Sequence, residues 1–286
     1  MRTLLGEASH ASDATRGRCR HTLPRVRCFK LDKKYSSYYH NYAMIDLNKQ
    51  IWTKKDGEDF NSLLLSMARA DKIEWTRRIV NTSMPLLALR AEEITALSKQ
   101  IKAGNVLSFL DLDLCEYHEN TMLNAKLISS LKDFDEFEKY LYMLIAHIDN
   151  WATCDTLSFG IWKKNKPKFL VLQQKLACDP RTFARRISVD MLFPLVDEEN
   201  IAYILNFVES LSEEKEYYVN MAAAWLICDC FIKRRAETLL CFESGRLNDF
   251  IVNKAVQKCR DSFRVSNADK DLLLKYRVPH TRLFAP

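Results

Sequence analysis

The stretch that decides the fold is PKFLVLQQKLACDPRTFARRISVDMLFP, residues 167–194. Three prolines divide it into helix-length segments: Pro167, Pro180 and Pro194. A proline fits the first turn of a helix, where its missing N–H costs nothing, and the residue before a proline disfavours helical backbone. The pattern therefore predicts two short helices, over 168–176 and 181–192, joined by a tight connection.

The same organisation continues on both sides of this stretch. Amphipathic segments of helical length lie at 60–67, 92–102, 121–131, 136–148, 198–210, 215–233, 236–243, 247–260 and 269–276. Only six glycines occur in 286 residues, whereas sheet and nucleotide-binding α/β proteins use glycine in many turns. Several segments are apolar on two faces and so need neighbours on both sides, which a stacked solenoid of helix pairs provides. We expect an all-α fold of this kind; a compact irregular bundle is the alternative, because the pairs do not align by residue identity.

Charge and composition suggest where the folded domain begins. Residues 1–34 hold nine Lys/Arg against three acids, so they carry the whole net charge of +6 and the remainder sums to zero. We expect a basic, disordered N-terminal extension at 1–34, a single domain at 35–277 and a tail at 278–286. A transit peptide or a wrongly assigned start codon are alternatives for the extension. If the folded part attracts nucleic acid, its basic side chains must therefore be gathered on one surface, apart from the acidic ones.

The cysteines favour neither a metal site nor a disulfide framework. There are nine, with no CxxC pair, and Cys228 and Cys230 are two residues apart, which turns their side chains away from each other on a helix. We expect reduced, buried thiols in a cytoplasmic protein, with no metal and no small-molecule cofactor. No apolar run reaches the length of a membrane span, so no membrane partner is expected.

The strongest candidate for chemistry is a tryptophan–aspartate pair. GxGxxG, GxxxxGK[ST], GxSxG and HExxH motifs are all missing. Asn150, or alternatively Asp149, is a suitable N-cap for a helix that begins at Trp151, and Trp151 and Asp155 then lie one turn apart on one face. Taken alone, the pattern is more typical of a core tryptophan and a solvated aspartate.

A basic run follows this pair. Residues 163–186 hold eight basic side chains and one acid: Lys163, Lys164, Lys166, Lys168, Lys175, Arg181, Arg185, Arg186 and Asp179. Such a run is usually a solvated face, but clustered Lys/Arg also bind duplex DNA by releasing its counterions. Further on, Trp225 follows three alanines, and local pattern favours a core tryptophan there.

Six segments together resemble the AlkD-type DNA alkylation repair proteins. They are DNWATCD (149–155), RRISV (185–189), YVNMAAAWL (218–226), and NKAVQK (253–258) followed by SFRV (262–265); MPLLALR (84–90) resembles the family's N-terminal segment, with Ala88 where glycine is usual. The resemblance runs from about residue 54 to residue 276 and is strongest over 141–265.

This resemblance implies an α-α superhelix of HEAT-like repeats that binds duplex DNA as a monomer in the cytoplasm, associated with the nucleoid. It also implies a DNA glycosylase that excises positively charged N3- and N7-alkylated purines without flipping the base. By motif, Asp155 is then the catalytic carboxylate, Trp151 and Trp225 line the lesion's sugar, and Arg186 contacts phosphate. Arg185, Lys163, Lys164, Lys166 and Lys168 are the further predicted DNA contacts.

The chemistry suits these residues, because an alkylated purine cation is already a good leaving group. A fixed carboxylate stabilises the oxocarbenium-like sugar, and indole faces attract it by cation–π interaction, worth about 0.5–2 kcal/mol each. Two alternatives remain open: a non-catalytic DNA-binding protein and a helical-repeat scaffold for protein partners.

Overall fold

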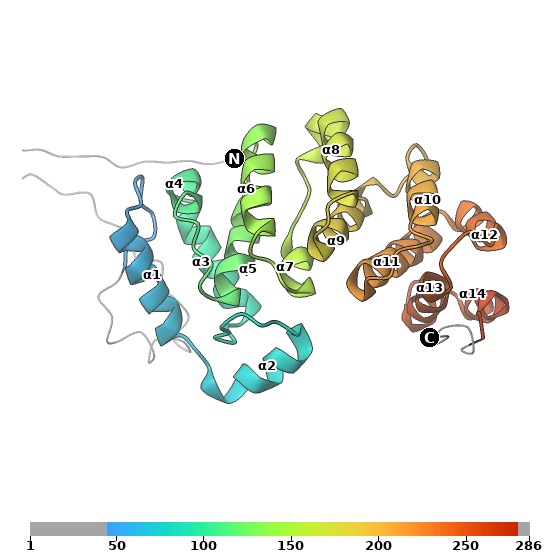
Figure 1. Cartoon of the computed structure of the whole chain (residues 1–286), viewed down its shortest axis with the longest axis horizontal. Coiled ribbons are helices and arrows are strands. Elements are labelled where there is room, and N and C mark those ends of the chain that lie inside the picture. Colours follow the sequence, from blue (N-terminus) through green and yellow to red (C-terminus); the bar gives the residue numbers. More distant parts are fainter. Residues whose placement is uncertain (1–44, 280–286) are drawn as a thin grey trace, which may run out of the picture. The chain divides into compact units, whose positions relative to one another are not determined.

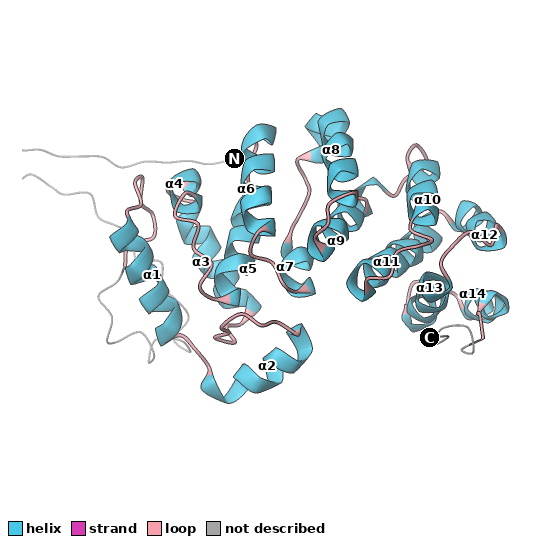
Figure 2. Ribbon diagram, in the orientation of Figure 1, coloured by secondary structure: helices cyan, strands magenta, loops and turns pink. Residues whose placement is uncertain are grey.

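The part of the chain that the structure describes is helical throughout (Figures 1 and 2). The structure is a computed structural model, and it describes residues 45–279. Within these residues there are fourteen α-helices and three 3₁₀ helices and no strand, so the predicted all-α class is confirmed. The predicted extension, 1–34, lies outside the described residues, and the predicted domain limits stay predictions.

The helices are short and follow one another closely. The first seven are α1 (Lys54–Ser66), α2 (Ile73–Val80), α3 (Ala91–Ile101), α4 (Val106–Leu110), α5 (His118–Ile128), α6 (Phe134–Ile145) and α7 (Trp151–Thr156). The others are α8 (Trp162–Ala177), α9 (Thr182–Asp190), α10 (Ile201–Ser210), α11 (Tyr217–Lys233), α12 (Arg235–Glu243), α13 (Asp249–Asp261) and α14 (Asn267–Leu272). The 3₁₀ helices are η1 (Ala70–Lys72), η2 (Phe193–Leu195) and η3 (Leu273–Tyr276). The sequence pattern missed α2, which buries only Val80, and α4, which spans five residues.

The prolines that suggested the fold act somewhat differently from the prediction. Helix α8 begins at Trp162 and not at residue 168, so Pro167 lies inside it. Its backbone bends at Asn165 (φ −131°, ψ 26°), and Pro167 therefore lies in the first turn of the segment after the bend. Pro180 lies just before Arg181, the N-cap of α9, and is not in the first turn. The prolines thus mark the joints, although the predicted ends shift by several residues.

The helices pack in two rows, which Figure 1 shows one above the other. The first row consists of α3, α5, α7, α9, α11 and α13, each of which contacts the next. The second row consists of α6, α8, α10 and α12, in which α6 contacts α8 and α10 contacts α12. Helices of the second row also pack on the first, for example α8 on α9 and α10 on α11. This pairing is typical of helical repeats, and the HEAT-like superhelix stays a prediction.

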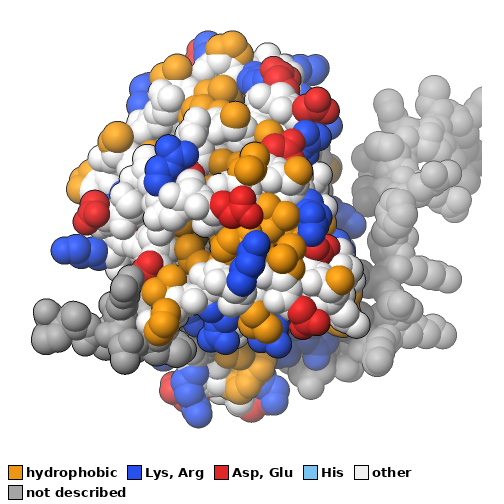
Figure 3. Space-filling model, turned by 90° about the vertical axis from the view of Figure 1, so that its right-hand side faces the viewer, with side chains coloured by type: hydrophobic (Ala, Val, Ile, Leu, Met, Phe, Trp, Pro, Cys, Tyr) orange, Lys and Arg blue, Asp and Glu red, His pale blue; other side chains and the backbone are white. Residues whose placement is uncertain are grey.

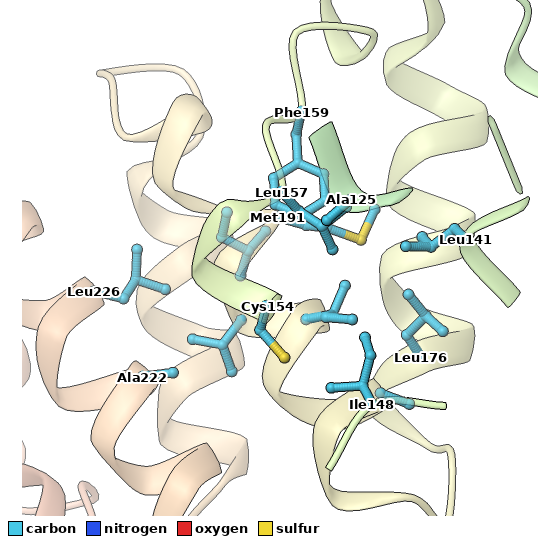
Figure 4. Close-up of a cluster of buried hydrophobic side chains, with 14 of the residues drawn as sticks. Ala125, Leu141, Ile148, Cys154, Leu157, Phe159, Leu176, Met191, Ala222 and Leu226 are labelled. Carbon is cyan, nitrogen blue, oxygen red and sulfur yellow. The ribbon is translucent and has the colours of Figure 1, made fainter. Parts of the chain in front are cut away.

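A continuous apolar core holds α7 between its neighbours. In the cluster of Figure 4, Cys154 of α7, Leu176 of α8 and Leu226 of α11 are all 0 % exposed, as is Met191 just after α9. Side chains in a closely packed protein interior have fixed positions. A change such as Leu226→Ala leaves a cavity and lowers the free energy of unfolding by about 2–5 kcal/mol. The solvent-facing side chains of the same helices therefore have a rigid support.

The thiols of the described residues follow the prediction with two exceptions, the exposed Cys178 and the partly exposed Cys115. Five cysteines are buried and free: Cys154, Cys228, Cys230, Cys241 and Cys259. Cys178 is exposed, contrary to the expectation, because it caps the solvent end of α8. Among residues 45–279, no group of three His, Cys, Asp or Glu side chains is arranged to hold a metal ion. In the same residues no helix has the length and apolar character required to cross a membrane.

Candidate active site

The short helix α7 is fixed at its first turn by polar side chains from three parts of the chain. The Asn150 side chain accepts a hydrogen bond from Thr153 N at 3.1 Å, so Asn150 is the N-cap and the predicted start at Trp151 is confirmed. Its Nδ2 lies 3.2 Å from Nδ1 of the buried His118. Burial lowers the pKa of His118 to about 4, only partly opposed by Asp149, so the ring is neutral and accepts from the amide.

The residue before this cap fastens α7 to the loop after α2. Asp149 accepts hydrogen bonds from Thr82 Oγ1 at 2.6 Å and from the backbone N of Ser83 at 2.7 Å. Burial acts to raise the pKa of Asp149, but hydrogen bonds from Thr82, Asn150 and Ser83 outweigh it and hold the pKa below its ordinary value. The carboxylate is therefore charged and keeps the 81–84 loop against α7.

The two tryptophans are not core residues. Trp151 is partly exposed, and its indole Nε1 donates a hydrogen bond to the carbonyl of Ile79 at 3.2 Å. Trp225 is 42 % exposed, so the interpretation of a buried tryptophan on α11 is wrong. Its ring packs edge-on against Phe193 at a centroid distance of 5.1 Å. Both indoles thus have a fixed orientation and an accessible side.

Asp155 is joined to α9 by a close ion pair. Its Oδ1 lies 2.6 Å from Nη2 of Arg186, while Nη1 of Arg186 donates to the carbonyl of Tyr218 on α11 at 2.7 Å. The Arg186 side chain is 5 % exposed and that of Asp155 is 21 % exposed. Arg186 therefore acts here as a buried support that ties α7, α9 and α11 together, with Asp155 at the surface of the group.

A third charged residue, Asp190, completes this group. It lies one turn after Arg186 on α9, with Oδ2 3.6 Å from Nε of Arg186, and its side chain is 8 % exposed. Burial raises the pKa of Asp190 to about 7, because it outweighs the opposing charge of Arg186, and Asp155 adds to the rise. The spacing of four residues was visible in the sequence, but nothing in the pattern showed that both side chains are buried.

Residues 60–241 match the protein family described as DNA alkylation repair enzyme. This match covers well over half of the chain and includes both tryptophans and the whole Asp155 group. The chain belongs to the DNA alkylation repair enzyme family. No curated protein matches the sequence. DNA is therefore the partner of this protein, and repair of alkylated DNA its general role.

One further residue near the site of this DNA alkylation repair protein lies beyond the matched segment. Lys258 of α13 places its Nζ 5.5 Å from the ring centroid of Trp225. Burial lowers the pKa of Lys258 and the positive charge of Arg186 adds to this, whereas Asp155 opposes it, so the ammonium lies within electrostatic range of both. It links Trp225 to the Asp155–Arg186 pair. The NKAVQK segment was a signal in the sequence, but the resemblance gave Lys258 itself no role.

The predicted basic DNA-contact run is largely neutralised by other helices. Lys166 pairs with Glu199 at 2.5 Å, Lys168 with Asp135 at 2.8 Å, and Arg185 with Glu214 at 2.8 Å. The partners Asp135 and Glu199 lie on α6 and just before α10, so these two lysines brace the second row and are not brought to Asp155. Lys163 and Lys164 are exposed at the start of α8. Their contact with DNA stays a prediction.

Two cavities of this DNA alkylation repair protein lie away from Asp155. A cavity of about 1020 Å³ lies between α11, α13 and α14, lined by residues such as Tyr217, Phe250, Lys254 and Arg277. Neither this cavity nor a small one beneath α5 and α6 includes Asp155 in its lining. On the face at the C-terminal end of the rows, basic, acidic and hydrophobic side chains are interspersed (Figure 3).

Proposed function

We propose that this protein is a DNA glycosylase that removes positively charged N3- and N7-alkylated purines from duplex DNA without flipping the base. The observation that carries the proposal is the position of Asp155, a carboxylate at the surface of a rigid group, one helical turn after the partly exposed Trp151 on α7 and linked through Lys258 to the partly exposed Trp225 on α11. An acid that protonates the base is unnecessary, because the alkylated purine leaves as a neutral molecule.

The reaction needs only stabilisation of the sugar. As the C1′–N bond breaks, its electron pair moves to the purine and neutralises the ring, and positive charge develops on the deoxyribose. A fixed carboxylate opposite this charge is preorganised to stabilise it, whereas water would have to reorient. Water then attacks C1′, and Asp155 orients this water and accepts its proton. The indoles of Trp151 and Trp225 add cation–π attraction.

In this proposal, Arg186 holds Asp155 in position. The Arg186 side chain is only 5 % exposed and already binds Asp155 and Tyr218 O, so little of the guanidinium is open to a phosphate. We infer that Arg186 orients Asp155, and that partly exposed lysines, above all Lys258 and Lys254 on α13, meet the phosphates.

The decisive test is Asp155→Asn, which keeps the shape and removes the charge. Release of 7-methylguanine from methylated duplex DNA should fall at least about tenfold, equivalent to about 1.4 kcal/mol of transition-state stabilisation. Affinity for undamaged DNA should hold or improve, because a carboxylate near phosphates repels them. The melting temperature of each variant is measured beside activity.

Three results would count against the proposal in different ways. Equal release by wild type and the Asn variant would remove Asp155 from the mechanism. No release by either, with DNA binding intact, would favour a non-catalytic DNA-binding protein. No DNA binding even at low salt would leave the protein-scaffold alternative.

A further inference from the structure

Three charged side chains from two helices form what we call the Asp155 cluster: Asp155 of α7 with Arg186 and Asp190 of α9. One guanidinium faces two carboxylates, through Nη2 to Asp155 at 2.6 Å and through Nε to Asp190 at 3.6 Å. When Asp190 is neutral the cluster has no net charge. When Asp190 is ionised the cluster carries one net negative charge. Asp155 is the only one of the three side chains through which this charge reaches the solvent.

The inner half of the cluster is unusually poor in hydrogen bonds. Arg186 Nε and Asp190 Oδ2 are both enclosed, and neither has a hydrogen-bond partner among the described residues. Leaving a buried polar atom without a partner costs about 1–3 kcal/mol. A leucine or methionine would fill this place on α9 at lower cost, so Asp190 is a poor choice for stability alone.

We propose that Asp190 is a positioning residue that competes with Asp155 for the charge of Arg186 and thereby leaves Asp155 negative enough to stabilise the sugar cation. This inference rests on the proposed glycosylase function. With Asp190 neutral, Asp155 and Arg186 form a nearly neutral pair whose field falls off steeply toward the DNA. With Asp190 ionised, the positive charge of Arg186 is shared between two carboxylates. The carboxylate of Asp155 then acts as a net negative charge and not as one end of a dipole.

The charge of Asp190 changes near neutral pH. Its pKa is raised to about 7, first by burial, while Arg186 opposes and Asp155 adds to the rise. Helix α7 also brings Cys154, a fully buried thiol whose raised pKa keeps it neutral. Helix α11 presents the Tyr218 carbonyl, which holds Arg186, and α8 presents Gln173, whose amide donates to Ser188 O on α9. From α13, Lys258 acts on Arg186 and Asp155.

The test compares wild type and Asp190→Asn in single-turnover release of 7-methylguanine across pH. The quantity is the ratio of the two rates at each pH, because any titration of the lesion itself is common to both enzymes and cancels. The ratio should be close to one near pH 5.5 and rise to at least about fivefold near pH 8.5, as Asp190 of the wild type ionises. Arg186 and Asp155 are untouched, so affinity for undamaged DNA should change less than about twofold.

The chain offers a matched control. Asp229 of α11 is also a buried carboxylate in the first row, but it pairs with Lys233 at 2.7 Å and with Arg264 at 3.5 Å and lies outside the cluster. Asp229→Asn should give a ratio to wild type that does not vary with pH. A ratio for Asp190→Asn that is equally flat would mean a merely structural role and would overturn the inference, while release by the wild type would still support the proposed function.

A second measurement tests the inference without a variant, in case Asp190→Asn fails to fold. The side-chain carboxyl carbon of Asp190 in the wild-type protein is followed by NMR from about pH 5 to about pH 9, and we expect it to titrate within this range. A carboxyl that stays ionised or stays neutral throughout would overturn the inference. No release by wild type at any pH would overturn the inference and the proposed function together.

Discussion

At the scale of single residues, Ala88 holds a backbone conformation that favours glycine. Its φ of 59° lies in the left-handed region, where an alanine is strained. The turn is held because the carboxylate of the buried Glu119 accepts backbone hydrogen bonds from Leu87 N at 3.0 Å and Leu89 N at 3.3 Å. The buried acid therefore compensates for the missing glycine and keeps the 86–90 segment in place.

Ala88→Gly should therefore stabilise the protein. Glycine adopts this backbone without strain, and the gain of about 0.5–1 kcal/mol exceeds the entropy that it adds to the unfolded chain. The measurement is the midpoint of urea unfolding. Ala91→Gly, in the first turn of α3, is the matched control and should cost stability, since glycine is a poor helix former. A midpoint for Ala88→Gly below that of the wild type would contradict the inference that Ala88 is strained.

At the scale of elements, α7 depends on its cap for both folding and function. It has six residues, too few for an isolated helix to be stable, so Asn150, His118 and Asp149 determine where Trp151 and Asp155 lie. Asn150→Ala should lower the free energy of unfolding by about 1–3 kcal/mol, because it removes the cap and leaves the buried His118 without its partner. Release of 7-methylguanine should fall as well.

The equivalent change at α4 separates the loss of stability from the loss of base release. Asn105 is also an asparagine N-cap and accepts from Ser108 N at 3.1 Å, but it lies far along the chain from Asp155. Asn105→Ala should lose about 1 kcal/mol of stability and keep the rate of base release in the folded fraction. Equal rates for the two variants would show that the cap of α7 is not needed to place Asp155.

At the scale of the whole molecule, the question is which cations meet DNA. Lys254 and Lys258 lie over the rings of Phe250 and Trp225, at 5.8 Å and 5.5 Å from the centroids, whereas Lys166 and Lys168 are paired with acids of the second row. Two double variants with the same loss of charge distinguish these pairs: Lys254→Ala with Lys258→Ala, and Lys166→Ala with Lys168→Ala.

The first double variant should weaken binding to all duplexes alike and reduce the slope of log affinity against log salt by roughly 2, about 0.9 for each phosphate that a lysine no longer neutralises. The second should keep affinity within about twofold and lower the melting temperature slightly, since exposed ion pairs contribute little. Fluorescence anisotropy at several salt concentrations measures both. The reverse result would support the sequence-based prediction that Lys166 and Lys168 bind DNA.

The sequence alone determined the features that depend on local chemistry. Helical periodicity, scarce glycine and the prolines of 167–194 predicted an all-α chain, and Asn150 predicted the start of α7, because capping and backbone restriction act within a few residues. The segments around Trp151, Asp155, Arg186 and Trp225 pointed to the family that residues 60–241 match. These signals needed no knowledge of what each helix would pack against.

Only the tertiary structure decided how charges and rings are partnered. It neutralised much of the basic run with acids such as Asp135 and Glu199, exposed Trp225, and buried Arg186 between Asp155 and Asp190. It also brought Lys258 to Trp225 from a helix beyond the family match. Burial and pairing arise between helices some thirty residues apart in the chain, where neither periodicity nor local charge carries information. A net charge counted along the sequence therefore cannot show which cations are left for DNA, because their partners come from other helices.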